Sequence, residues 1–329
     1  MPEERAVNVQ VQVAGKMALR PFIETIGTLN PYDEVTVSAE VDGVLKSAKV
    51  DEGTVVSKGM LLATIDDTDY DLEVKGAEAA LRRSEATLAN TRLEYQRKET
   101  LYKEELVTRQ QFDDVSTRLS LAEADLEMSR VALSLARESL KKTNIVSPLS
   151  GVVKEKKASA GDFVRNGTEL FVIITDNPIK LNFTVTKKDV GKVKKGQDIV
   201  FRVDTFPEME FQGRVDIVYP AVDEITRTLQ VEALVPNPRV LKPGMFASVI
   251  LYTGLPKETV LVPATSLLYE EEKIKVFVVE NKTAIERLIK VGQKYGEMTE
   301  VTEGLKEGEL VVTVGQQNLF EGAKVNVVN

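Results

Sequence analysis

The side chains that most often do chemistry in enzymes are largely missing from this sequence. It contains no cysteine and no histidine, which excludes thiol nucleophiles, imidazole bases, a Ser–His–Asp triad and any zinc site built from these two residues. The 51 Asp and Glu residues supply many carboxylates. No pair of them stands at a recognisable spacing for acid–base catalysis, and no nucleophile–base set can be named. We therefore expect no catalytic residues, and a hydrolase hidden in the C-terminal part is a weak hypothesis.

A metal site is equally unsupported by the residue types. Without His or Cys, a transition metal would need methionine or carboxylate ligands. The seven methionines are scattered along the chain, a distribution that favours packing roles. We expect no metal site.

Composition narrows the class of protein further. Of the 329 residues, 43% are hydrophobic and 29% are charged, and the formal net charge is −8. This balance is typical of a globular protein of several domains, and no cluster of Lys and Arg interleaves with aromatics as in a nucleic-acid binder. No apolar run approaches the 18 residues that a membrane span needs. If the protein is exported, we expect its signal or anchor segment to lie outside this sequence, because the polar start lacks a hydrophobic core.

An internal repeat is the most informative pattern in the sequence. Residues 39–66 align without a gap on residues 147–174, and each copy alternates short apolar runs with Gly-bearing turns, as short β-strands do. Identical pairs include Gly43/Gly151, Gly53/Gly161, Gly59/Gly167, Val44/Val152, Lys46/Lys154, Lys49/Lys157, Val56/Val164 and Leu62/Leu170. The repeat resembles the two halves of a biotinyl/lipoyl-type flattened β-barrel.

Carrier proteins with that fold join the two halves at a turn that bears a modified lysine. Here the first half ends at residues 65–69, Ile-Asp-Asp-Thr-Asp, and no lysine occupies the turn. The second half begins only after a long insertion. A carrier domain of an acyl or carboxyl transfer enzyme is the alternative from a different functional class, and the missing lysine argues against it. We expect no cofactor.

The insertion, residues 70–144, has the composition of a long helical hairpin. It contains no proline and one glycine, Gly76, and it is rich in strong helix formers. Larger apolar residues recur every seven positions, which predicts a left-handed antiparallel coiled coil. Arms of about 35 residues would give a rod of roughly 50 Å. The apolar residues are Val74, Leu81, Leu88, Tyr95 and Tyr102 in the first arm, and Phe112, Leu119, Leu126, Leu133 and Leu140 in the second.

Small residues mostly occupy the positions three residues after the apolar ones, and they allow close approach of the helices. Charged residues fill the outward positions almost without a break, so we expect both arms to stand in water. The turn is predicted at residues 104–108. Thr108 and Gln111 form a capping box for the second arm, with Val107 and Phe112 placed as a hydrophobic staple. A core helix pair within a globular domain is the alternative interpretation.

A lipoyl-like barrel split by a helical hairpin resembles the membrane fusion protein, or periplasmic adaptor, family. In that family an Arg, a Leu four residues on and a Ser or Thr seven beyond that mark the hairpin tip that docks on TolC-like outer-membrane channels. The matching residues here are Arg97, Leu101 and Thr108. A lone match of this kind in a random sequence would mean only a solvated charge, coil packing and a helix cap. Leu106 and Val107 would add exposed apolar contacts at the tip.

The resemblance also implies a domain plan, with an α+β, mostly β fold. An elongated chain would contain a lipoyl-like domain in two halves, the helical hairpin, a six-stranded-type antiparallel β-barrel and a β-rich membrane-proximal domain. The expected limits are 35–68 and 145–175 for the lipoyl-like domain, 69–144 for the hairpin, 18–34 and 176–254 for the β-barrel, and 1–17 and 255–329 for the membrane-proximal domain.

The function implied is that of a periplasmic adaptor attached to the inner membrane. It would link an inner-membrane transporter to a TolC-like outer-membrane channel for export of small molecules, and it would assemble as a hexamer. A transporter of the resistance-nodulation-division (RND) type is favoured, and an ATP-driven (ABC-type) export system is the alternative. The partners are thus the transporter, the channel and further copies of the chain, with no nucleic acid.

Overall fold

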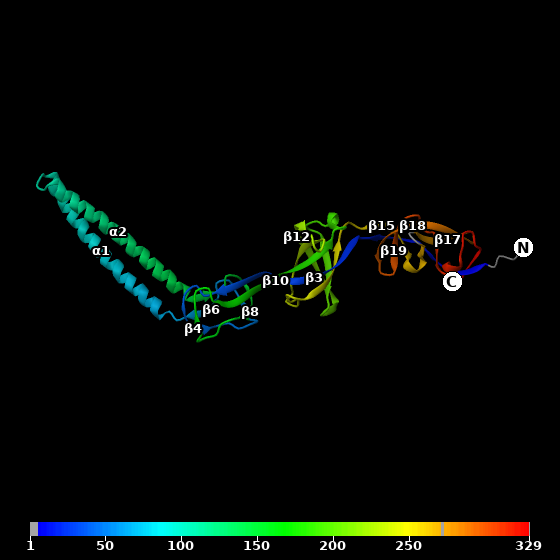
Figure 1. Ribbon diagram of the computed structural model, residues 1–329, viewed down its shortest axis with the longest axis horizontal. Coiled ribbons are helices and arrows are strands. Elements are labelled where there is room, and N and C mark those ends of the chain that lie inside the picture. Colours follow the sequence, from blue (N-terminus) through cyan, green and yellow to red (C-terminus); the bar gives the residue numbers. More distant parts are fainter. Residues whose placement is uncertain (1–5, 271–272, 329) are drawn as a thin grey trace. The chain divides into compact units, whose positions relative to one another are not determined.

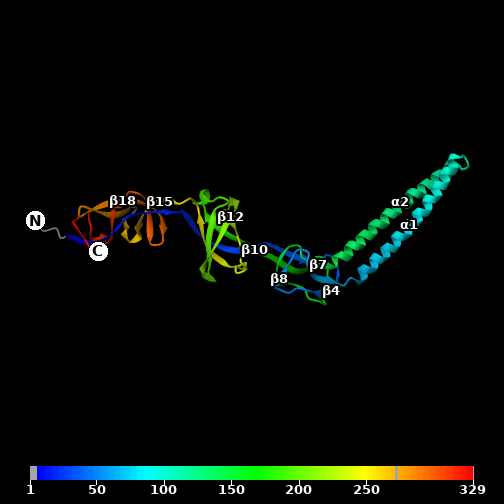
Figure 2. The same cartoon turned by 180° about the vertical axis from the view of Figure 1, so that it is seen from behind.

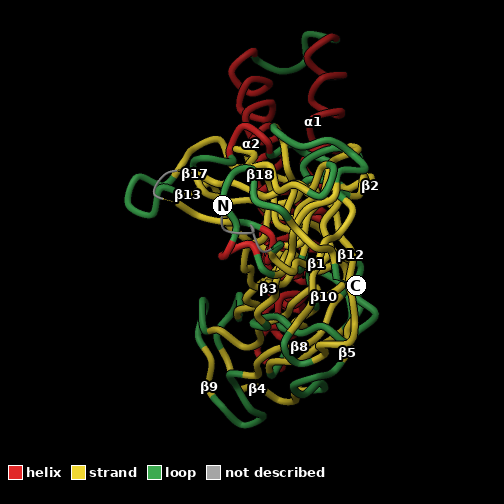
Figure 3. The backbone as a smooth tube through the Cα atoms, turned by 90° about the vertical axis from the view of Figure 1, so that its right-hand side faces the viewer, coloured by secondary structure: helices red, strands yellow, loops and turns green. Residues whose placement is uncertain are grey.

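The computed structural model describes residues 6–270 and 273–328. The chain divides into two compact units, one of which holds residues 29–180 and 235–244, while the other holds the rest of the described chain. Strands dominate both, and the described residues contain two α-helices, α1 and α2. The mostly β fold class with a helical hairpin is confirmed. Figure 3 shows strand and loop throughout, apart from the hairpin and a few short helical turns.

The hairpin consists of α1, Thr68–Lys103, and α2, Arg109–Lys142. The two helices lie side by side along their length (Figure 1), and the turn falls at residues 104–108, as predicted. The buried residues of the arms are the predicted heptad residues or their small partners, so the coiled-coil pattern is confirmed. They are Val74 and Leu88 in α1, and Val115, Ala122, Leu126 and Leu133 in α2.

The two sequence repeats form one interlocked structure at the base of the hairpin, here called the split barrel (residues 43–65 and 144–174). Strands of the first repeat pair with strands of the second. Gly43 pairs with Val164, and the equivalent residues Gly151 and Val56 also pair. The repeat in sequence is therefore an approximate two-fold repeat in structure. Its strands are β4 (Gly43–Ala48), β5 (Val55–Val56), β6 (Leu61–Ile65), β7 (Asn144–Val146), β8 (Gly151–Lys156), β9 (Phe163–Val164) and the first part of β10 (Glu169–Thr186).

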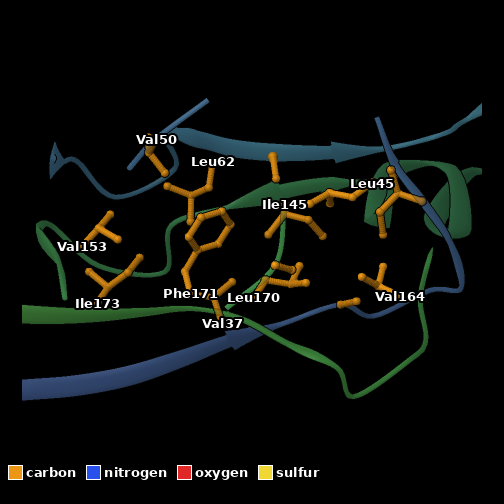
Figure 4. Packing of buried hydrophobic residues seen from close by; sticks show 14 of the residues in the cluster. Val37, Leu45, Val50, Leu62, Ile145, Val153, Val164, Leu170, Phe171 and Ile173 are labelled. Carbon is orange, nitrogen blue, oxygen red and sulfur yellow. The ribbon is translucent and has the colours of Figure 1, made fainter. Parts of the chain in front are cut away.

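The core of the split barrel draws on both repeats. Phe171 is fully buried, and its ring lies among Leu62, Ile145 and Val37 (Figure 4). Gly59 and Gly167, at equivalent places in the two repeats, have φ of 82° and 89°. These are left-handed turn conformations that disfavour a side chain.

The second unit contains an antiparallel barrel and a larger sheet. In the barrel, β14 pairs with β3 along residues 22–28 and with β11, which also pairs with β12. Figure 2 shows this set of strands from behind, around β12 and β10. The strands are β3 (Phe22–Ser38), β10, β11 (Asp198–Val203), β12 (Phe206–Val222), β13 (Thr228–Val235) and β14 (Phe246–Tyr252).

The larger sheet combines both ends of the described chain. Strand β1 pairs with β20 in antiparallel and with β21 in parallel orientation, and the sheet order is β2-β15-β19-β18-β17-β20-β1-β21, with β16 on β17. The strands are β1 (Val7–Val13), β2 (Gly15–Leu19), β15 (Lys257–Pro263), β16 (Leu268–Glu270), β17 (Lys273–Glu280), β18 (Thr283–Tyr295), β19 (Met298–Glu303), β20 (Leu310–Val314) and β21 (Val325–Val327).

The expected domain limits stay a prediction. Two of them, at 34/35 and at 175/176, fall inside the continuous strands β3 and β10. Of the predicted membrane-proximal domain, residues 1–5, 271–272 and 329 lie outside the described residues. No helix within the described ranges is apolar and long enough to cross a membrane.

Candidate functional site at the hairpin tip

The end of α1 is closed by a Schellman motif. The Leu106 N–H donates to the Leu101 carbonyl at 2.8 Å, and the Glu105 N–H donates to the Tyr102 carbonyl at 3.0 Å. These bonds satisfy carbonyls that a helix end leaves without a partner. Glu105 has the left-handed φ of 60° that this motif usually assigns to glycine. The tip therefore has one well-defined backbone path, which includes a strained non-glycine residue.

The start of α2 is fixed by the predicted capping box, which is confirmed. The Gln111 N–H donates to the Thr108 hydroxyl oxygen at 3.3 Å, and the Thr108 N–H donates to the Gln111 side-chain oxygen at 3.3 Å. The Thr108 side chain remains exposed, so its hydroxyl proton can still be donated outward. The staple between Val107 and Phe112 stays a prediction.

Aromatic rings hold the two arms together just below the turn. Phe112 of α2 stacks on Tyr102 of α1, with ring centres 5.0 Å apart and planes 5° from parallel. The ring centre of Phe112 also lies 5.5 Å from that of Tyr95. Aromatic pairs of this kind contribute about 0.5–1.5 kcal/mol beyond their buried area. The tip thus rests on a packed base.

Ion pairs between the arms add alignment lower down the rod. Arg118 donates two bonds to the Glu94 carboxylate, at 3.1 and 3.0 Å, and Arg92 lies 3.2 Å from Glu123. Because these groups are largely exposed, each pair contributes only about 0–1 kcal/mol. Their bidentate and cross-arm geometry fixes the register of the arms more than it adds stability.

Arg97 differs from most arginines of the hairpin. Its side chain is exposed, and within the described part of the chain it makes no ion pair or side-chain hydrogen bond. It lines a shallow groove of about 340 Å³ with Thr87, Asn90, Thr91 and Glu94. An exposed guanidinium without a partner keeps its donors available to carbonyls or carboxylates of another molecule. The paired arginines of the hairpin are Arg92, Arg109, Arg118, Arg130 and Arg137.

The structure brings all five residues predicted for the tip to one end of the hairpin. Arg97 and Leu101 lie in the last two turns of α1, Leu106 and Val107 lie in the loop, and Thr108 caps α2. Leu106 is 66% exposed, whereas Leu101 and Val107 are half-buried. The sequence analysis missed Glu105, because a glutamate gives no sign in the sequence that it adopts a left-handed conformation.

The opposite end of the hairpin stands where a carrier protein would present its lysine. The Asp66 carboxylate accepts hydrogen bonds from the Thr68 hydroxyl at 2.7 Å and from the Thr68 N–H at 3.1 Å. These bonds hold the pKa of Asp66 below its ordinary value, with the hydroxyl as the largest cause. The side chain thus opens α1 as a local turn.

Acidic residues elsewhere form no evident ion site. Across residues 6–270 and 273–328, no group of three or more His, Cys, Asp or Glu side chains lies close enough to hold a metal ion. Lys275, nearly buried, lies 2.7 Å from Glu270 and 3.2 Å from Glu286, and the Glu270 hydrogen bond is the first cause that raises its pKa. The two carboxylates balance the positive charge of the lysine, which therefore supports the sheet as an ion pair.

Family models match most of the chain in three consecutive segments. Residues 33–176 match the barrel-sandwich hybrid domain of RND membrane fusion proteins. Residues 178–254 match the CusB-like β-barrel domain, and residues 259–327 match the YknX C-terminal permuted SH3-like domain.

Curated relatives cover nearly the whole chain. Multidrug resistance protein MdtA of Proteus mirabilis is 29% identical over 330 residues, covering 97% of this chain and 80% of that protein. The MdtA protein of Escherichia coli O45:K1 shows the same identity and coverage.

Solved structures with the same fold include MacA from Actinobacillus actinomycetemcomitans, with a TM-score of 0.72 and 24% identity over 91% of this chain and 97% of that one. A MacA–MexA chimeric protein containing the Pseudomonas aeruginosa MexA α-hairpin domain gives a TM-score of 0.64 and 28% identity, over 92% of this chain and 99% of that one. With a split barrel, a helical hairpin and three consecutive domain matches, the chain belongs to the membrane fusion protein family, the adaptor proteins of RND-type efflux.

Proposed function

We propose that this protein is a periplasmic adaptor that links an inner-membrane RND transporter to a TolC-like outer-membrane channel. The hairpin tip docks on the channel, and the adaptor is attached to the inner membrane. The names of the MdtA relatives support small molecules such as drugs as the exported compounds. The adaptor has no chemistry of its own in this proposal, and the transporter supplies the energy.

The observation that carries the proposal is the combination of groups at the tip. Arg97 offers an exposed guanidinium with no ion pair among the described residues. Leu106 offers an exposed apolar side chain, and Thr108 offers a hydroxyl held in place by its own capping box. A rigid support under a few exposed polar and apolar contacts is what a docking surface needs. Solvent alone would not require Leu106 at this place.

The charge of Arg97 can be tested in cells that depend on this adaptor for drug resistance. We expect Arg97→Asp to reduce resistance to the level of cells without the adaptor, because it replaces charge-assisted bonds worth about 1.5–3 kcal/mol at each tip with repulsion. Arg97→Lys, which keeps the charge but not the planar fork, should fall between the two. Resistance is measured as the minimum inhibitory concentration, and circular dichroism checks that the helices remain folded.

A neighbouring position provides the matched control. Gln96→Asp places the same carboxylate on an exposed residue of the same helical turn and leaves Arg97 in place, so we expect near-normal resistance. Full resistance in a folded Arg97→Asp variant would contradict the docking role.

A photoreactive residue provides a direct readout of the partner. Placed at Leu106, it should give an adduct with an outer-membrane channel. At Leu72, which is 60% exposed near the opposite end of α1, it should give no channel adduct.

A further inference from the structure

Two short segments connect the antiparallel barrel to the larger sheet. Residues 20–21 lie between β2 and β3, and residues 253–256 lie between β14 and β15. The segments run side by side, because Thr253 donates to the Pro21 carbonyl from its N–H at 2.9 Å and from its hydroxyl at 3.2 Å. Leu255 in the longer segment is 84% exposed and therefore packs on little else. A few loop residues of this kind are what a hinge between two rigid parts consists of.

The side-chain amide of Gln293 bridges the larger sheet and the barrel beside these segments. Gln293 lies in β18, and its side-chain oxygen accepts a bond from the Phe22 N–H at 3.2 Å. Its side-chain NH₂ group donates to the Phe22 carbonyl at 2.6 Å. Phe22 is the first residue of β3 and pairs with Tyr252 within the barrel. A side-chain amide offers the same donor and acceptor as a peptide group, so Gln293 bonds to β3 as a residue of a neighbouring strand would.

A β-bulge in the larger sheet directs Gln293 toward Phe22. The register of β18 against β19 shifts within residues 291–294, and bulges of this kind change the direction of a side chain. The Gln293 N–H donates to the Glu300 carboxylate at 3.1 Å, and that carboxylate also accepts from the Thr259 hydroxyl at 2.7 Å. A side chain at Gly292 would collide with Glu300. The bulge is therefore held by specific residues of its own sheet.

Aromatic rings pack next to the two hydrogen bonds. Tyr295, two residues after Gln293, lies on the same side of β18. Its ring centre is 5.5 Å from that of Phe22, and the ring planes meet at 73°, which is the favourable edge-to-face arrangement. Phe22, Gln293 and Tyr295 are all half-buried. The contact between sheet and barrel thus has an apolar part beside its polar part.

Arg20 holds the connecting segments against the barrel. Its guanidinium donates to the Gly254 carbonyl at 3.3 Å, lies 3.4 Å from the Asp198 carboxylate and stands 4.4 Å over the Tyr252 ring. Asp198 and Tyr252 belong to the barrel strands β11 and β14. These contacts fix where the hinge starts, but they do not reach the larger sheet. The angle between sheet and barrel is left to Gln293 and the ring pair.

We propose that Gln293 acts as a clasp that fixes the orientation of the larger sheet relative to the barrel, and that residues 20–21 and 253–256 form the hinge about which the two move when the clasp opens. Gln293 is a positioning residue, which acts through Phe22. Water can bond to the freed groups of Phe22, so the clasp opens reversibly. Two net hydrogen bonds favour the closed arrangement by about 5- to 150-fold.

Distances between spin labels test the clasp directly, since the chain has no cysteine of its own. The labels are attached to Gln212→Cys in the barrel and Gln12→Cys in the larger sheet, both at exposed positions, and the distances are measured by pulsed electron paramagnetic resonance. With Gln293 in place we expect one narrow distance distribution. Gln293→Met keeps the length of the side chain but has no amide. It should broaden the distribution or add a second population.

Gln197 provides the matched control, because it makes the same two kinds of bond within the barrel alone. Its side-chain oxygen accepts from the Lys194 N–H at 2.8 Å, and its NH₂ group donates to the Lys192 carbonyl at 2.8 Å. Gln197→Met should leave the distance distribution narrow. Equal broadening in both variants would overturn the proposal, and so would a narrow distribution in Gln293→Met.

Hydrogen exchange separates an open clasp from an unfolded sheet. In Gln293→Met the Phe22 amide should exchange faster, while the amides of β17 remain protected, since opening about the hinge leaves the sheet intact. Loss of protection throughout β17 would mean that the sheet itself unfolds, and would overturn the clasp. Both measurements use purified protein and need no export. Their outcome is therefore independent of the proposed function, which Arg97→Asp tests in cells.

Discussion

Glu105 has a backbone conformation that is unfavourable for a residue with its side chain. Its φ of 60° lies in the left-handed region, which costs an ordinary residue about 1–2 kcal/mol. The Schellman hydrogen bonds of Glu105 and Leu106 hold it there. A non-glycine residue in this position at the predicted docking end suggests that something other than stability selects its side chain.

Replacement of Glu105 by glycine should stabilise the hairpin. The left-handed strain would disappear, while the added freedom of glycine in the unfolded chain would offset about 0.5–1 kcal/mol, so we expect a net gain of about 0.5–1 kcal/mol. Thermal unfolding followed by far-ultraviolet circular dichroism measures the change. Glu104→Gly is the control, because Glu104 has a φ of −88° that any residue adopts. It should lower stability, and an equal gain in both variants would contradict the role of the strain.

At the residue scale, the sequence predicts what depends on local pattern. Thr108 and Gln111 stand three residues apart at the start of an apolar repeat, and that spacing alone identifies a capping box. The left-handed Glu105 could not be foreseen, because glutamate has no preference for that conformation. It is set by the need to turn the chain between two helices whose register is fixed elsewhere.

Helix α2 has a second apolar side besides its seam, formed by the exposed residues Leu121, Met128 and Leu135 and called here the outer stripe. Outward positions were expected to be charged, and here that expectation is wrong. The seam side includes Leu126, which is 8% exposed, and the outer side includes Leu121, which is 60% exposed. The seam was identified from one large apolar residue in every seven, which is about two helical turns. The residues of the outer stripe follow the same seven-residue period, but each comes two residues after a seam residue. Periodicity alone does not say which stripe is covered within the chain. The contacts of Leu88, Ala122 and Leu126 decide it.

The two leucines should therefore respond very differently to the same substitution. Leu126→Asp buries a carboxylate in the seam and should unfold much of the hairpin, with a large loss of helical circular dichroism. Leu121→Asp changes an exposed residue. It should leave the helical circular dichroism of the isolated protein unchanged and its free energy of unfolding within about 0.5 kcal/mol of the normal value. Unchanged helicity in Leu126→Asp would mean that the seam is assigned to the wrong residues.

At the scale of the whole molecule, the split barrel decides the organisation of the chain. Each of the pairings β4–β9, β5–β8 and β6–β7 joins the first repeat to the second, so neither half has all of its strand partners until the hairpin has returned. The repeat and the insertion were readable from the sequence because glycines and heptads are local signals. The limits between domains were not, because β3 and β10 run unbroken through two of them.

Loss of the shared core should therefore affect both halves together. Phe171 is fully buried, and Phe171→Ala should cost about 3–5 kcal/mol of stability through lost burial and the cavity that remains. Because the hairpin is tied at both ends to this core, its helices should melt at the same lowered temperature. Phe163→Ala removes a phenylalanine of the same domain that is 62% exposed and should cost far less. A hairpin that melts separately in Phe171→Ala would contradict this coupling.

The paired strands at the base of the hairpin have a consequence for the distance that the protein can bridge. Thr64 of β6 and Asn144 of β7 stand side by side, so the chain leaves and re-enters the barrel at one point, whatever lies between. Removing the same seven residues' height from each arm would shorten the rod by about 10 Å. One seam residue would be lost from each arm, while the remaining seam residues, the cap at Thr108 and the barrel would keep their alignment. The length of the hairpin can thus change over evolution in steps of seven residues per arm, while its tip and the barrel at its base stay the same.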